Sequence, residues 1–167
     1  MITPIPDKLP FQPAYIFTDV DDTLTLDGKL PLETYSALYS LQKAGIKVVP
    51  VTGGCGGWCD CILRTWPIDT IIGENGAFIM SLENDRLSTT FIQDTKTRKA
   101  NQAQLNELIS TIEVQVPEAQ LTGDCQYRIT DKAYDIRQDR VLPEEKVREV
   151  LQICTIKSVW LENFPGG

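Results

Sequence analysis

The 167-residue chain contains no histidine. Its absence excludes mechanisms in which histidine activates a serine or cysteine nucleophile, so acid–base chemistry falls to carboxylates, lysine, tyrosine or cysteine. Positive charge is also scarce, and a formal net charge of −7 argues against nucleic-acid partners and anionic membrane surfaces, which attract basic proteins. No apolar run approaches the roughly 20 residues of a membrane-spanning helix. The N-terminus lacks the basic and apolar segments of a signal peptide, so we expect a cytoplasmic protein.

Cysteine occurs five times, and three of the residues (Cys55, Cys59 and Cys61) crowd into "CGGWCDC". A structural zinc site usually needs four ligands, often as two separated pairs or with histidine. We therefore interpret these cysteines as reduced thiols without metal or redox chemistry.

The first 81 residues show the pattern of a parallel α/β unit. Apolar runs predict strands at 14–20, 46–52 and 69–73, and helices are predicted at 31–45 and 58–66. A turn, "ENGA", and a further apolar stretch, "FIM", follow. Alternating strands and helices predict a parallel sheet with right-handed crossovers. The second strand is nearly all apolar, as expected if both of its faces are covered.

From about residue 82 the pattern changes to that of a small α+β unit. Helices are predicted at 98–114 and 143–154, and short strands at 86–92, 119–122, 126–130, 133–137 and 155–161. The sequence thus predicts a first domain over 1–81, a second over 82–160 and a tail over 161–167.

The segment "FTDVDDTLT" (17–25) places Asp19 and Asp21 at the carboxyl end of the first predicted strand. Thr52 ends the second strand, and ligands of open parallel sheets bind outside these ends. A divalent cation would relieve the repulsion between the two carboxylates, and such hard oxygen ligands suit Mg²⁺ bound together with a phosphate. We interpret Asp22, with Thr23, as a turn residue whose side chain bonds backbone amides.

Together, "DVDDTLT" and its apolar strand resemble the first motif, Asp-x-Asp-x-Thr, of the haloacid dehalogenase-like (HAD-like) hydrolase superfamily. "VVPVTGG" resembles the second motif. "GENGAF", "GWCDCILRTWPID" and "YRITDKAYDI" resemble the branch that contains sucrose-phosphate and mannosyl-phosphoglycerate phosphatases. The resemblance covers residue 14 to about 160 and implies a HAD-like α/β Rossmannoid sheet with an inserted α+β cap.

The resemblance implies a role for each matching residue. Asp19 is expected to attack phosphorus, and Asp21 to act as general acid and then as base. Mg²⁺ is expected on the Asp19 carboxylate and the Asp21 carbonyl, with Thr52 and the Gly53 amide binding the phosphate. The implied activity is hydrolysis of a small phosphorylated metabolite, of the sugar-phosphate kind, through an aspartyl-phosphate.

Candidate substrate-reading residues are Asn75 in the third-strand turn and Arg128 and Asp131 in the cap. The alternative for Arg128 and Asp131 is an ordinary ion pair across two strands on a solvated face.

Two parts of the family's machinery have no match: a lysine after the cap and a late acidic motif. Lys157 falls inside a predicted strand. The sequence therefore resembles the first half of a phosphatase core with its cap, truncated afterwards. Losing such groups costs about 10²–10³ in rate for a single donor, so weak or absent turnover is expected. The alternatives are an incomplete protein that binds Mg²⁺, a phosphate ligand or a partner chain, and a phosphotransferase of the phosphomannomutase kind.

The same resemblance leaves the first strand without a neighbour on one side. An open strand edge invites pairing. We expect this edge to be covered by self-association, by a swapped segment or by the tail at 161–167.

Overall fold

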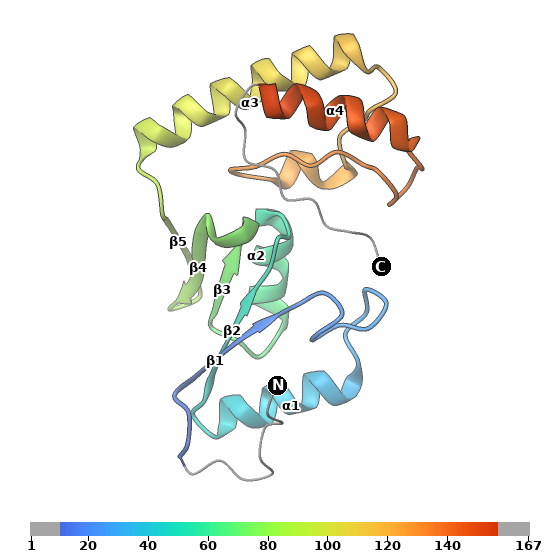
Figure 1. The fold of residues 1–167 in the computed structure, drawn as a ribbon. Coiled ribbons are helices and arrows are strands. Elements are labelled where there is room, and N and C mark those ends of the chain that lie inside the picture. Colours follow the sequence, from blue (N-terminus) through green and yellow to red (C-terminus); the bar gives the residue numbers. More distant parts are fainter. Residues whose placement is uncertain (1–10, 157–167) are drawn as a thin grey trace. The chain divides into compact units, whose positions relative to one another are not determined.

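The computed structural model describes residues 11–156. The chain divides between Ile92 and Gln93 into two compact units. Figure 1 colours the first from blue to green and the second from yellow to red.

The first unit is built on a five-stranded sheet with the order β1-β2-β3-β4-β5. The strands are β1 (Tyr15–Asp19), β2 (Lys47–Val51), β3 (Thr70–Gly73), β4 (Phe78–Glu83) and β5 (Arg86–Phe91). As predicted, β1, β2 and β3 are parallel. β4 and β5 continue the sheet in antiparallel fashion. The predicted α/β class is confirmed, and β1 lies at one edge of the described sheet.

Helices α1 (Leu32–Lys43) and α2 (Gly56–Thr65) connect the parallel strands. Both occupy the predicted segments, although α2 begins two residues early because the Cys55 sulfur accepts a hydrogen bond from the Trp58 amide and caps it. Gly45 follows α1 with φ +76°, a left-handed conformation that favours glycine at a helix end.

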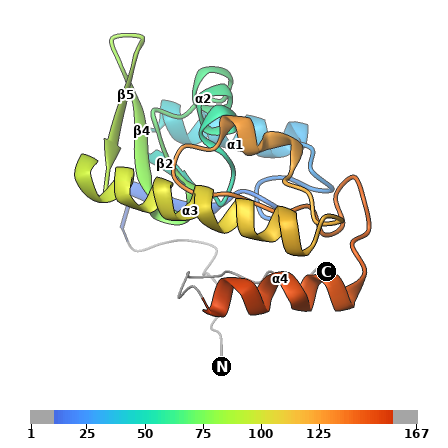
Figure 2. The same cartoon turned by 90° about the horizontal axis from the view of Figure 1, so that it is seen from above.

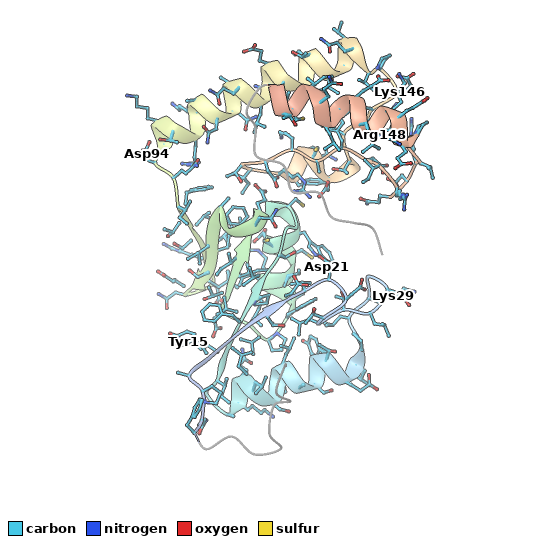
Figure 3. All side chains as sticks on the ribbon, viewed as in Figure 1. Tyr15, Asp21, Lys29, Asp94, Lys146 and Arg148 are labelled. Carbon is cyan, nitrogen blue, oxygen red and sulfur yellow. The ribbon has the colours of Figure 1, made fainter. Side chains whose placement is uncertain are left out.

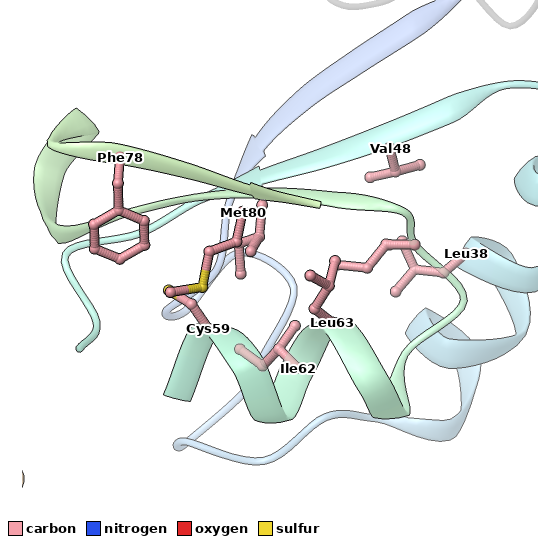
Figure 4. Close-up of a cluster of buried hydrophobic side chains, with 9 residues drawn as sticks. Leu38, Val48, Cys59, Ile62, Leu63, Phe78 and Met80 are labelled. Atoms are coloured by element: carbon pink, nitrogen blue, oxygen red, sulfur yellow. The ribbon is translucent and has the colours of Figure 1, made fainter. Parts of the chain in front are cut away.

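Both helices pack on the same face of the sheet. Figure 4 shows Leu38 of α1 and residues of α2 beneath the sheet side chains. The cluster comprises Leu38, Val48, Cys59, Ile62, Leu63, Ile68, Ile71, Phe78 and Met80. The opposite face carries the exposed rings of Tyr15 and Phe17. β2 itself is buried on both faces, because the consecutive residues Val48, Val49 and Pro50 are all buried, as its apolar sequence predicts.

The β4–β5 hairpin moves the domain boundary. The sequence predicts a boundary after residue 81, but β4 and β5 pair over six residues and close through Asn84 and Asp85, both at positive φ. Such a two-residue turn matches the twist of a hairpin. The strand predicted at 86–92 therefore belongs to the first unit.

The second unit contains two long helices, α3 (Thr95–Gln115) and α4 (Glu144–Ile156), which lie side by side in Figure 2. Leu108, Ile112 and Val116 of the α3 region pack with Val150 and Cys154 of α4. Both helices were predicted. α3 begins earlier than expected because Asp94 caps it, accepting the Thr97 amide at 2.8 Å. Along residues 11–156 no helix is long and apolar enough to span a bilayer.

The strands predicted at 119–122, 126–130 and 133–137 do not form. The segment holds a short 3-10 helix, η2 (Gly123–Tyr127), and a single bridge between Leu121 and Tyr134. The Cys125 sulfur accepts a hydrogen bond from the Ala133 amide at 3.3 Å. A side chain therefore binds a backbone N–H group that would otherwise donate to a neighbouring strand. The strand predicted at 155–161 begins inside α4; its remainder and the 161–167 tail lie outside the described residues.

We expect Asp135→Asn to destabilise the second unit. Asp135 is 7 % exposed, and its two carboxylate oxygens accept the amides of Gln138 (2.7 Å) and Asp139 (3.1 Å). These bonds, that of Gln138 above all, hold the pKa of Asp135 below its usual value. The stabilisation is present above the unfolded pKa of about 4 and is lost as pH falls through the folded value.

Urea midpoints at pH 7 and pH 3, followed by circular dichroism, would check this. The two proteins should differ at pH 7 and approach each other at pH 3. Asp139→Asn is the matched control, since the exposed Asp139 takes part in the turn through its amide. Equal midpoints for Asp135→Asn and the wild type at pH 7 would contradict the prediction.

Candidate active site

The carboxyl ends of the three parallel strands meet at one end of the sheet. Asp19 pairs in register with Val51, and Val51 with Ile72. The Thr52 amide donates to the Ile72 carbonyl at 3.0 Å and continues this alignment. The structure thus brings Asp19, Thr52 and the turn after β3 together, as the sequence predicts.

The loop after β1 is organised around the carbonyl of the buried Val20. This oxygen accepts the amides of Leu24 and Thr25, both at 2.9 Å, and the Thr25 hydroxyl at 3.1 Å. Asp22, at φ +54°, donates its amide to the Thr25 hydroxyl oxygen at 3.3 Å. Thr25, which sequence reasoning missed, anchors the turn that we had assigned to the side chains of Asp22 and Thr23. In the sequence, the only indication of this role is that Thr25 is the second threonine of "DDTLT".

Asp19 and Asp21 lie exposed at the end of β1, where Figure 3 labels Asp21. Thr23 donates its hydroxyl to Asp19 Oδ2 at 3.4 Å. Partial burial raises the pKa of the Asp21 carboxyl, and the charges of Asp19 and Asp22 raise it further. Within residues 11–156 no ion pair compensates these three carboxylates.

The loop after β2 is held from two sides. Thr52 is 2 % exposed, and its hydroxyl oxygen accepts the Gly54 amide at 2.9 Å. The Asn75 amide donates to the Thr52 carbonyl at 3.2 Å. A β-carbon on Gly53 would lie only 2.9 Å from Asn75 Oδ1, so glycine permits the contact between these two loops.

Glu74 is a positioning residue that sequence reasoning missed. It is 3 % exposed, and its carboxylate accepts the Gly56 amide at 3.0 Å, at the start of α2. The Glu74 amide donates to the Gly54 carbonyl at 3.3 Å. A carboxylate is favoured at a helix N-terminus, so Glu74 fixes the loop to the helix. In the sequence, the segment that indicates this role is "GENGA", in which we predicted a function for Asn75 but not for Glu74.

In the second unit, Arg128 and Asp131 bind each other. Arg128 Nη1 donates to both Asp131 oxygens, at 2.9 and 3.0 Å, and Nη2 pairs with Asp124 at 3.1 Å. The Arg128 side chain is only 12 % exposed. These ion pairs join residues of a single segment, 124–131, and do not connect two strands as the alternative from the sequence expected.

The residues at the end of β1 fit a magnesium ion in the chemistry of their donors. The Asp19 carboxylate and the Asp21 carbonyl are hard oxygen ligands, and nearby carboxylates lack compensating cations in the described chain. No group of three acidic, cysteine or histidine side chains able to hold a metal occurs among residues 11–156.

We expect metal analysis of the purified protein to find no stoichiometric zinc. Cys55 caps α2 and Cys59 is buried in the core of the first unit, whereas Cys61 is exposed on the helix. These three sulfurs therefore face different surroundings, and zinc requires its ligands around one point. About one zinc per chain would contradict the prediction.

The sequence matches the model of the haloacid dehalogenase-like hydrolases over residues 16–157. The chain therefore belongs to the HAD-like hydrolase family. No curated protein matches it.

Solved structures share the fold. Protein 0175 of Thermoplasma acidophilum has a TM-score of 0.64 at 17% identity, with 88% of this chain and 59% of that chain covered. A HAD-like hydrolase of Bacteroides thetaiotaomicron has a TM-score of 0.50 at 16% identity, with 93% of this chain and 53% of that chain covered. The IMP-nucleotidase of Plasmodium falciparum has a TM-score of 0.54 at 10% identity, with 87% of this chain and 41% of that chain covered. The chain thus spans less than two thirds of each of these relatives.

Proposed function

We propose that this chain carries the nucleophile of a Mg²⁺-dependent phosphatase for a small phosphorylated metabolite of the sugar-phosphate kind. The observation that carries the proposal is the meeting of Asp19, Asp21 and Thr52 at the carboxyl ends of β1 and β2. This is the part of a parallel sheet where ligands bind.

In the proposed reaction an Asp19 oxygen attacks phosphorus, and the bond from phosphorus to the ester oxygen breaks. Asp21 gives its proton to the leaving alkoxide. Asp21 then takes a proton from water, which attacks phosphorus and releases Asp19 and phosphate. The raised pKa of Asp21 supports this role, since a general acid must hold a proton near the working pH.

Thr52 and Gly53 are proposed to bind the phosphoryl oxygens. The Thr52 hydroxyl accepts a bond from Gly54 and donates none to a described residue, so its proton suits a phosphoryl oxygen. Asp19 and the carbonyl of Asp21 would hold Mg²⁺, which neutralises phosphate charge when bound.

For substrate choice we propose Asn75, which borders Gly53. The same role for Arg128 and Asp131 requires that a ligand bind their ion pair as a unit, because Arg128 already donates to Asp124 and Asp131. Phosphate binding without turnover is the second candidate, favoured by the scarcity of metal-binding carboxylates among residues 11–156.

Beryllium fluoride with Mg²⁺ tests the proposal without requiring turnover. It mimics a phosphoryl group on a carboxylate, so calorimetry should show binding that requires both components. Binding together with phosphate release from an aryl phosphate would support the phosphatase, and binding alone the second candidate. Absence of binding would contradict both.

A further inference from the structure

Trp58 is an exposed aromatic residue in the first turn of α2, beside the loop that we assign to phosphate. It is 46 % exposed. A β-carbon on Gly54 would lie 3.0 Å from Trp58 Cδ1 and 3.2 Å from Thr52 Oγ1. The indole and the threonine hydroxyl are therefore separated by no more than the sum of these two distances, about 6 Å. An aromatic ring thus borders the point assigned to the phosphoryl group.

Within residues 11–156 the core of the first unit does not include this ring. Trp66 packs against the core cluster, whereas Trp58 does not. The buried positions of α2 are Gly56, Cys59, Ile62 and Leu63. A tryptophan side chain can bury about 150–250 Å² of surface, so a ligand that covers Trp58 has a large contact area to gain.

Hydrogen bonds of the backbone fix the ring and the loop on which it rests. The Trp58 amide donates to the Cys55 sulfur at 3.4 Å. The Gly54 amide donates to the Thr52 hydroxyl oxygen at 2.9 Å, and the Gly54 carbonyl accepts the Glu74 amide at 3.3 Å. Groups that are fixed before a ligand arrives do not have to be ordered when it binds, which favours affinity.

We propose that Trp58 is a specificity-determining residue of this site, which stacks on a ring that the ligand carries directly beside its phosphate group. A sugar ring has an apolar face of C–H groups and an edge of hydroxyl groups. The indole suits the face, and the amide side chain of Asn75, which borders Gly53 of the same loop, suits the edge. A cyclic sugar phosphate is therefore favoured over an open-chain phosphate ester. The inference rests on the proposed function and names the substrate class for it.

The short distance between Trp58 and Thr52 favours a sugar ring over a nucleobase as the stacked group. In a sugar phosphate the ring is joined to the phosphate through one ester oxygen or through one further CH₂ group. In a nucleotide the base lies beyond the ribose, so the ribose occupies the space beside the phosphate. The indole therefore meets the sugar in both kinds of ligand.

Binding of phenyl phosphate with Mg²⁺ tests the stacking, because the phenyl ring needs no hydroxyl recognition. Trp58→Ala should weaken this binding at least about tenfold, the size expected for the loss of one stacked ring. Trp58→Phe keeps an aromatic face and should stay within about threefold of the wild type. Both variants should bind beryllium fluoride with Mg²⁺ as the wild type does, since this ligand carries no ring. Calorimetry measures both affinities, and KM replaces the first where phenyl phosphate is turned over.

Tyr39→Ala is the matched control, because Tyr39 is 47 % exposed but lies on α1, outside the loops of the site. Equal phenyl phosphate binding by Trp58→Ala and the wild type would overturn the inference alone, as would a wild type that binds beryllium fluoride but not phenyl phosphate. Loss of both ligands in Trp58→Ala would assign the ring a structural role and also overturn it. A wild type that binds no beryllium fluoride would contradict the proposed function and the inference together.

The substrate class has its own test, in which cyclic sugar phosphates are each compared with the open-chain alditol phosphate of the same carbon number. The wild type should prefer the cyclic member of at least one pair about tenfold, and Trp58→Ala should lose that preference. Trp58→Ala should also weaken ribose 5-phosphate and adenosine 5′-monophosphate by the same factor. Absence of a cyclic preference in every pair, or a loss confined to the nucleotide, would overturn the assignment to a sugar ring.

Discussion

Asp19→Asn is expected to lower Mg²⁺-dependent phosphate release from an aryl phosphate at least about a hundredfold. An amide is a poor nucleophile and a weaker ligand for a hard cation than a carboxylate. The same substitution should abolish Mg²⁺-dependent binding of beryllium fluoride, a measurement that remains possible if turnover of the wild type is weak. Phosphate assays and calorimetry on the two purified proteins check both outcomes.

Asp22→Asn is the matched control. It removes one carboxylate from the same loop, and asparagine tolerates the left-handed conformation that Asp22 adopts at φ +54°. The amide that Asp22 donates to Thr25 is unchanged. If Asp19→Asn and the wild type bind and release phosphate equally, Asp19 takes no part in the mechanism.

Phe78→Ala should destabilise the first unit by about 3–5 kcal/mol, the usual cost of truncating a buried phenylalanine. Phe78 is 1 % exposed and makes an edge-to-face contact with Phe91, with centroids 6.0 Å apart. A β-carbon on Gly73 would collide with the Phe78 ring, which shows how tightly the ring fills this site. Urea unfolding followed by circular dichroism measures the effect.

Phe11→Ala provides the comparison, since Phe11 is 66 % exposed and its truncation should stay within about 0.5 kcal/mol of the wild type. The loss in Phe78→Ala should appear in the transition of the first unit and spare that of the second, because the two have separate cores. Equal midpoints for the two variants would show that the Phe78 cluster does not stabilise the fold.

Local pattern was sufficient to predict the parallel strands and the four helices. Each strand is a short apolar run closed by a turn, and each helix has a capping residue or a periodic apolar face, so neighbours in sequence carry the information. The same holds for the positions of Asp19, Asp21 and Thr52, because strands that run parallel end at one edge.

Tertiary structure alone decided the rest. The alternating sequence of β5 predicts an ordinary half-exposed strand, and only its pairing with β4 assigns it to the first unit. Cys125 and Ala133 bond across eight residues, which removes strands that local alternation predicts. The buried carboxylate of Glu74 finds its donor at Gly56, eighteen residues earlier in the chain. These features depend on contacts between residues that lie far apart in the sequence. Hydrophobic periodicity predicts the type of an element and its buried face, but it does not predict which distant residues that element will contact.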